Sequence, residues 1–263
     1  MVYYIAGAGR SGSTLLDIVL GNLGENFSMG EMINFVQNGL VDNEYCSCGK
    51  RVFDCEFWSK VASKWEKERT LSLSEYKNIQ WKYLRNKRTL HSIWNYWFPS
   101  DDYKKLISDT TKLYRIVFEV SEKKIIIDSS KNPQYILLLK KTDLPLKIIH
   151  IKRNFNNVLK STRKTLKKDP KKGIEETIKP QSITYSFLNW FTTNILVVLF
   201  TLFDKRILIN YEDFINNPLS TIVKIQKLNK MDIEILKNRG PFKPKHIVAG
   251  GRVRMSKEVI IKM

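Results

Sequence analysis

The chain has 263 residues, of which 43% are hydrophobic and 11% aromatic, with 12 glycines and 8 prolines. This composition excludes a disordered chain and fits one large folded domain spanning residues 1–263. The formal net charge of +19 favours phosphate-bearing ligands, nucleic acid or an acidic surface, and does not choose among them.

An apolar run, Val2–Ala6, opens the chain and has the length of a β-strand. No basic segment precedes it and no small-residue cleavage site follows it, so we expect no export and a cytoplasmic protein. Three cysteines, Cys46, Cys48 and Cys55, agree with a reducing compartment.

A glycine-rich segment, with the sequence AGAGRSGSTLL, joins this strand to a predicted helix over Ser13–Gly21. Glycines let successive backbone N–H groups converge on an anion, and the start of the helix adds a favourable dipole. Gly7 and Gly12 have the spacing of a Walker loop, yet Ser13 stands where a nucleoside triphosphatase has its lysine. The nearest basic side chain is Arg10, which disfavours a kinase.

A long segment, about residues 45–120, is predicted to be a helical insertion that carries most of the tryptophans. The aromatic side chains favour core packing over ligand binding, because tryptophan contributes strongly to buried surface. In an α/β transferase, however, such an insertion commonly forms one wall of the site that binds the variable substrate. The five tryptophans are Trp58, Trp65, Trp81, Trp94 and Trp97.

Strand and helix patterns alternate through the rest of the chain, which predicts an α/β protein with a parallel sheet covered by helices. The strands are predicted at Lys124–Asp128, Leu146–Ile151 and Arg206–Asn210, and the helices at Gln134–Lys141, Asn156–Thr165, Ser182–Leu202 and around Pro218–Asn229.

Two segments of this second half stand out by composition. The apolar stretch Ile183–Phe203 is interrupted by polar residues, so we expect a buried amphipathic helix and no transmembrane span. Lys160–Lys172 contains seven basic residues in thirteen, which favours a solvated charge run over a mobile lid or a nucleic-acid surface.

The segment GRSGSTLL, from Gly9 to Leu16, resembles the 5′-phosphosulfate loop of the sulfotransferases that use 3′-phosphoadenosine-5′-phosphosulfate (PAPS). Ser161 follows Arg153 by eight residues. In that family a serine also follows an arginine by eight residues, and these two residues hold the 3′-phosphate. The resemblance implies a three-layer fold like that of the P-loop nucleoside triphosphatases. It also implies that Arg10 and Arg153 hold opposite ends of one nucleotide.

Four further segments are similar to the family. The C-terminal one differs in having Gly251 where the family pattern has asparagine. Cys46, Cys48 and Cys55 fall in a pattern similar to bacterial members, and we expect no metal there, because a structural zinc site takes four ligands and no fourth cysteine or nearby histidine is present. The segments are DSSKNP at 128–133, NYEDF at 210–214 followed by Pro218, HIVAGGRVR at 246–254, and CSCG at 46–49 with CEFW at 55–58.

The resemblance implies a role for each site residue. Arg10 contacts the phosphosulfate and its bridging oxygen, Lys131 is a second cation near the sulfonate, and Glu31 is the general base, placed as in the tyrosylprotein sulfotransferases. The residues expected to bind the nucleotide are Gly9, Arg10, Ser11, Gly12, Ser13, Thr14, Arg153, Ser161, Tyr211, Arg252 and Arg254.

The sequence therefore predicts transfer of a sulfonate group from PAPS to a hydroxyl, with release of adenosine 3′,5′-bisphosphate and without a metal. The acceptor is a small molecule, a carbohydrate or another hydroxyl compound, and no specific nucleic acid is expected. Two alternatives stay open: a P-loop kinase or nucleoside triphosphatase with an unconventional lysine, and a basic polyanion- or nucleic-acid-binding protein. The sequence does not define the oligomeric state.

Overall fold

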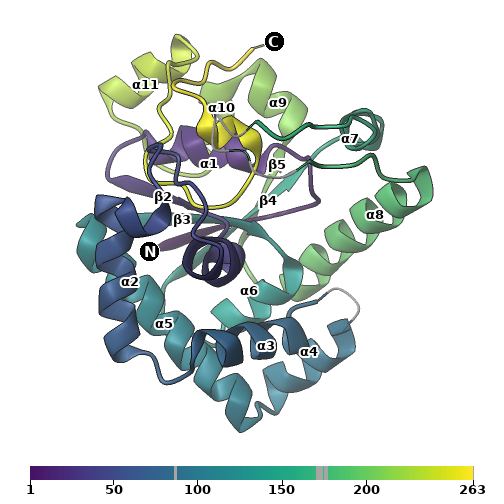
Figure 1. Ribbon diagram of the computed structural model, residues 1–263. Coiled ribbons are helices and arrows are strands. Elements are labelled where there is room, and N and C mark those ends of the chain that lie inside the picture. Colours follow the sequence, from purple (N-terminus) through teal and green to yellow (C-terminus); the bar gives the residue numbers. More distant parts are fainter. Residues whose placement is uncertain (86–87, 170–173, 175–176, 263) are drawn as a thin grey trace.

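A parallel β-sheet of five strands forms the centre of the computed structural model, which describes residues 1–85, 88–169, 174 and 177–262 (Figure 1). The strand order is β2-β3-β1-β4-β5, so β1 is central and pairs in parallel with both β3 and β4. This arrangement confirms the predicted α/β fold. The strands are β1 (Val2–Ala6), β2 (Asn26–Gly30), β3 (Ile125–Lys131), β4 (Leu146–Lys152) and β5 (Arg206–Asn210).

Helices cover both faces of the sheet and give three layers (Figure 1). Because side chains alternate along a strand, Tyr4 of β1 packs into the apolar cluster on one face and Ile5 into the cluster on the other. The Ile5 face is covered by α1 (Ser13–Gly21), α9 (Tyr211–Asn216), α10 (Pro218–Ile222) and α11 (Lys230–Lys237), and the Tyr4 face by α2 (Glu56–Glu68), α5 (Asp101–Ser121), α6 (Pro133–Leu139) and part of α8 (Ile183–Phe200).

The helical insertion lies between β2 and β3 and consists of α2, α3 (Leu73–Tyr83), α4 (Thr89–Trp97) and α5. Its tryptophans divide into two groups. Trp58 and Trp65 are fully buried in the core, as the sequence predicted, whereas Trp81, Trp94 and Trp97 are each more than 60% exposed. Core packing therefore accounts for two of the five tryptophans.

Two element predictions were wrong. Strand β2 was not predicted, because its sequence NFSMG lacks a continuous apolar run. The predicted helix over Pro218–Asn229 ends early at Ile222, and α11 begins after Asn229. Asn229 starts this new helix because its side chain accepts a hydrogen bond from the Asp232 backbone, and the Asp232 side chain caps Asn229 in return.

Helix α8 is exposed along most of its surface, so the expectation of a buried helix was wrong. Its buried positions include the polar residues Ser186, Thr193 and Asn194, while apolar side chains such as Phe187 and Phe191 face outward. Asn194 anchors it to the sheet through a 2.8 Å hydrogen bond with His150. Among the described residues, one helix, α8, is long and apolar enough to cross a membrane, and 28% of its 18 residues are buried. One such helix does not by itself define a membrane span.

Candidate active site

The glycine-rich loop joins β1 to α1 at the carboxyl end of the sheet, where ligands of open α/β sheets bind. Gly7 and Gly12 both have positive φ angles, +149° and +90°. A Cβ atom on Gly7 would lie 2.2 Å from the carbonyl oxygen of Ile151, and one on Gly12 would lie 2.2 Å from the ring of Tyr211. The loop therefore fits against β4 and Tyr211 only with glycine at these positions.

Two basic residues of the site have left-handed backbone conformations. Arg10 has a φ of +68° and Lys131 a φ of +66°, and such positions cost about 1–3 kcal/mol each in a residue with a side chain. Both side chains line one cavity together with Glu31 and Arg252. Burial, and secondarily the charge of Arg252, lowers the pKa of Arg10. This excess of positive charge favours an anionic ligand in the cavity.

Arg153, at the end of β4, reaches the glycine-rich loop. Its Nη1 donates a 3.0 Å hydrogen bond to the carbonyl oxygen of Arg10, and its guanidinium lies 4.2 Å from the centre of the Tyr211 ring. The structure therefore brings Arg10, Arg153 and Tyr211 together. Arg153 Nε and Ser11 Oγ are buried without a protein partner within the described residues, so both polar groups remain for a ligand.

Glu31 lies just after β2 and is 8% exposed. Its Oε1 forms an ion pair with Nζ of Lys131, and its Oε2 accepts a 2.9 Å hydrogen bond from the amide of Asn34. The backbone N–H of Glu31 donates to the carbonyl oxygen of Val248 at 3.2 Å. The carboxylate is thus held at the cavity between β2 and the C-terminal segment.

Two buried aspartates support this part of the sheet, and the sequence analysis gave them no role. Asp128 accepts hydrogen bonds from the backbone N–H groups of Met32 and Ser130 and from the hydroxyl of Tyr114. Asp17 accepts hydrogen bonds from two serine hydroxyls. Burial raises the pKa of Asp128 to about 6 and that of Asp17 to about 7, although the hydrogen bonds act in the opposite direction.

The C-terminal segment packs on the start of α1. Gly251 N–H donates a 3.0 Å hydrogen bond to Thr14 Oγ1, and a Cβ on Gly251 would lie 3.0 Å from the same oxygen. A side chain here would require Thr14 to move by a few tenths of an ångström. Arg252 lines the cavity and binds the carbonyl oxygen of Leu166 at 2.6 Å.

Not every residue expected to bind the nucleotide lines the cavity. Arg254 is 7% exposed, donates a 2.6 Å hydrogen bond to the carbonyl oxygen of Tyr45 and pairs with Glu44. Ser161 lies on α7 (Phe155–Thr162), whose cavity-lining residues are Val158 and Thr162. The structure therefore ties Arg254 to the segment around Tyr45, and neither Arg254 nor Ser161 is among the residues that line the cavity.

The remaining predicted contacts belong to the loop and the start of α1. Gly9 lines the cavity beside Arg10, whereas Ser13 and Thr14 are buried in the first turn of α1. A second cavity, lined by Arg153 among others, adjoins the first at Trp190, which lines both. The two cavities have volumes of about 250 Å³ and 460 Å³. The Lys-rich segment is only partly described, because residues 170–173 lie outside the described residues.

A parallel sheet with a glycine-rich anion loop after β1 and a cation-lined cavity defines an α/β protein built to bind a phosphate-like group. Residues 3–234 match the sulfotransferase family, and the chain belongs to that family. This confirms the resemblance read from the sequence and implies a transferase. No curated protein gave a significant match.

Solved sulfotransferases share the fold. The structure is similar to the sulfotransferase domain from the curacin biosynthetic pathway, with a TM-score of 0.52 and 14% identity over 98% of this chain and 82% of that one. It is also similar to sulfotransferase STF9 from Mycobacterium avium, with a TM-score of 0.50 and 8% identity over 90% of this chain and 66% of that one. At these identities the likeness shows the fold.

Proposed function

We propose that the protein transfers the sulfonate group of PAPS to a hydroxyl of a small acceptor, in the cytoplasm. The observation that carries the proposal is the meeting of Arg10, Lys131 and Glu31 at one cavity, with Arg153 in contact with the same loop. Family membership supports the transfer of a sulfonate group. The donor and the acceptor are inferred from the chemistry of the site.

The residues present fit the donor. The N–H groups of the loop between Gly9 and Thr14, together with Arg10, would hold the phosphosulfate, whose sulfonate is the group transferred. The free Nε of Arg153 and the ring of Tyr211 would bind the phosphorylated adenosine, and Ser11 Oγ offers a further hydrogen bond. The negative charge of the donor would balance the cations of the cavity.

Glu31 accepts the proton of the acceptor hydroxyl as the oxygen attacks sulfur. A new bond forms between this oxygen and sulfur, and the bond between sulfur and the bridging oxygen breaks, so that adenosine 3′,5′-bisphosphate leaves. Arg10 stabilises the negative charge that develops on the bridging oxygen, and Lys131 stabilises the sulfonate oxygens. Asn34 fixes the Glu31 carboxylate for this step.

A third cavity, of about 550 Å³, is lined in part by Asn34, which donates a hydrogen bond to Glu31, and is proposed for the acceptor. Ile33 and Asn34 form one wall and α3 the other, with Trp81 and Arg85 among its lining residues. The Arg85 guanidinium lies 3.3 Å from the centre of the Trp81 ring. An aromatic surface beside polar groups suits a ring-bearing hydroxyl compound such as a carbohydrate.

A ligand titration followed by thermal unfolding tests the donor. Adenosine 3′,5′-bisphosphate should raise the melting temperature more than AMP or ATP with Mg²⁺, because only this ligand engages both anion sites. Arg153→Ala should weaken its binding about tenfold to hundredfold, the effect of losing charge-assisted hydrogen bonds. Arg115→Ala, which removes an exposed arginine paired with Asp143, is the matched control and should bind as the parent protein does.

Other results would contradict the proposal. A larger shift with ATP and Mg²⁺ would identify a nucleoside-triphosphate enzyme. Binding of long duplex DNA that falls steeply with salt, with no preference for a 3′-phosphate, would identify a polyanion-binding protein.

A further inference from the structure

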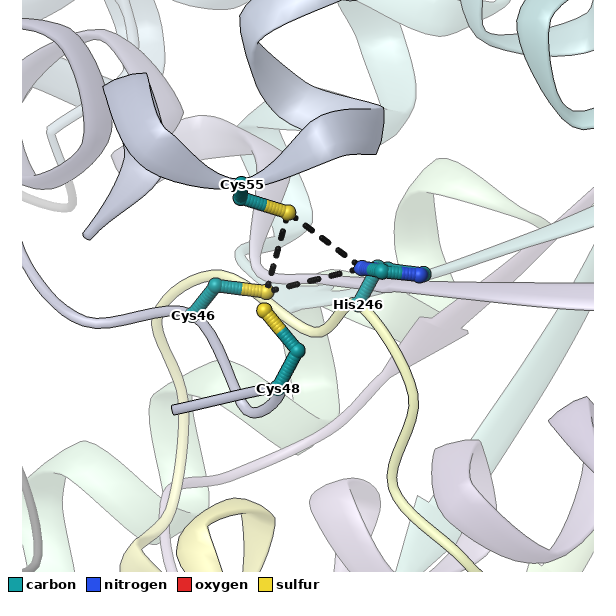
Figure 2. A group of neighbouring side chains, drawn as sticks. All are labelled: Cys46, Cys48, Cys55 and His246. Carbon is teal, nitrogen blue, oxygen red and sulfur yellow. Dashed lines mark hydrogen bonds between the residues drawn. The ribbon is translucent and has the colours of Figure 1, made fainter. Parts of the chain in front are cut away.

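Three cysteines and a histidine meet beside the sheet, on the side of β2. Cys46 and Cys48 come from the loop before α2, Cys55 precedes the first turn of α2, and His246 comes from the C-terminal segment. Figure 2 shows their side chains pointing toward one another. The expectation of no metal rested on the lack of a fourth ligand, and the fold supplies that ligand from a histidine 191 residues after Cys55.

The distances fit a tetrahedral metal site. The sulfurs of Cys46 and Cys55 are 3.8 Å apart, and His246 Nδ1 lies 4.0 Å from the first and 3.3 Å from the second. All four ligand atoms lie within 4.8 Å of one another. Zinc bonded to sulfur at about 2.3 Å and to nitrogen at about 2.0 Å in a tetrahedron separates two sulfurs by about 3.8 Å and a sulfur from a nitrogen by about 3.5 Å.

Neighbouring aromatic side chains hold the histidine in place. The indole N–H of Trp58 donates a 2.5 Å hydrogen bond to the carbonyl oxygen of His246. Such outer contacts orient metal ligands. The ring of Phe57 stacks on His246 at 5.5 Å, which holds the imidazole with Nδ1 facing the sulfurs.

We propose that Cys46, Cys48, Cys55 and His246 bind one zinc ion. Three thiolates and one imidazole are a ligand set that selects zinc, and four protein ligands make a closed, structural site. Cys46 and Cys55 are not joined by a disulfide, because their sulfurs are 3.8 Å apart and a disulfide bond is about 2.05 Å long. Disulfide formation would also need an oxidant.

The ion would fasten the C-terminal segment to the protein behind the active site. His246 lies two residues before Val248, whose backbone bonds to Met29 and to Glu31. The same segment continues to Gly251, which contacts Thr14 at the start of α1. Zinc at this point therefore positions the segment that lies over the phosphate loop and the base, and takes no part in the chemistry itself.

Metal analysis of protein purified under reducing conditions with zinc present tests the proposal directly. We expect one zinc ion per chain, which survives gel filtration and is released, with three thiols becoming reactive, by a strong chelator. Replacement by cobalt should give the visible absorption of a tetrahedral thiolate site. These readouts need neither PAPS nor turnover, so the outcome is independent of the proposed function.

Variants separate metal binding from general damage to the loop. Cys48→Ser should lose most of the zinc, and because Cys48 is exposed its replacement leaves the core intact. Ser47→Ala is the matched control: it removes the hydrogen bonds that Ser47 Oγ donates to the Lys245 carbonyl oxygen and accepts from the Ile247 N–H, on either side of His246, and should keep the zinc. His246→Ala should resemble Cys48→Ser.

Three results would overturn the proposal. One is protein without zinc whose three thiols react freely before any chelator is added. Another is a Cys46–Cys55 disulfide that, once reduced, still takes up no zinc. The third is full zinc content in both Cys48→Ser and His246→Ala.

Discussion

Glu31 and Lys131 form an ion pair across the cavity, and each is placed by a different strand end: Glu31 follows β2 and Lys131 ends β3. Asp128, three residues before Lys131, binds the N–H of Met32, the residue after Glu31. Glu31 and Lys131 therefore share one buried support. This arrangement explains why a carboxylate in a loop-like sequence holds a fixed position.

Glu31→Gln keeps the size of the side chain and its contact with Asn34 but removes the proton acceptor. We expect turnover to fall by about 10²–10⁴-fold, the usual contribution of a general base, with the affinity for adenosine 3′,5′-bisphosphate nearly unchanged. Steady-state rates and nucleotide titration measure the two effects separately.

Glu25→Gln is the control for that change. Glu25 precedes the same strand and also pairs with a lysine, Lys124, but the pair is exposed. This variant should keep normal turnover. An active Glu31→Gln protein would remove Glu31 from the mechanism and leave the nucleotide site untouched.

At the scale of elements, the insertion contains buried and exposed tryptophans that its composition alone does not separate. Trp65 is fully buried, donates a 2.8 Å hydrogen bond to the Asp109 carbonyl oxygen, and packs edge-on against Tyr76. Trp81 is 61% exposed and lines the proposed acceptor cavity. Only the fold shows which tryptophan belongs to which group.

Trp65→Ala should lower the free energy of unfolding by about 3–5 kcal/mol, because it leaves a large cavity in the core. Trp81→Ala should lower it by about 1 kcal/mol or less, since it removes an exposed ring and its contact with Arg85. Urea unfolding of both variants measures the difference. Equal losses of stability would contradict the division of the insertion into core and acceptor-facing parts.

The sequence was sufficient where local signals agree. Val2–Ala6 and Ser13–Gly21 were predicted with the bounds that the structure has, because an apolar run and a glycine loop mark both. Strand β2 was not predicted from the sequence, because Asn26 and Ser28 are polar and residues of this type usually lie at the surface. In the fold, Asn26 donates to the Leu20 carbonyl oxygen and Ser28 to Asp17. These contacts exist only after folding.

The site residues were also predictable only where a local sequence pattern marks them. The loop around Arg10 carries its own pattern, whereas the pairing of Glu31 with Lys131 and of His246 with the cysteines joins residues about 100 and 200 positions apart. Ser161 and Arg254 were expected at the nucleotide from their resemblance to family motifs, and neither lines the cavity, because a motif does not encode the direction of a side chain. Packing around Tyr45 and Glu44 sets the direction of Arg254.

At the scale of the whole molecule, buried titratable groups on two strands and one helix make stability depend on pH in opposite directions. Asp17 has a pKa raised from 3.8 to about 7 by burial, so the folded protein holds a proton that the unfolded chain releases. Its stabilising effect is complete below about pH 4 and is lost as pH rises through about 7. Asp128 acts in the same direction.

His150 acts in the opposite direction. Burial lowers its pKa from 6.5 to about 4, so the unfolded chain binds a proton first and stability is lost as pH falls through this range. The free energy of unfolding of the parent protein therefore varies with pH as the sum of opposing contributions from the two aspartates and His150. A difference between two proteins that share His150 and Asp128 isolates the part due to Asp17.

Asp17→Asn removes the ionisable group while keeping a side chain that can bond to Ser28 and Ser129. Relative to the parent protein, the variant should become more stable as pH rises from about 4 to about 7, because only the parent must ionise the buried carboxyl group of Asp17. Urea unfolding of both proteins at several pH values in this window measures the difference. A difference that is constant across the window, or that shrinks as pH rises, would show that Asp17 titrates normally in the folded protein.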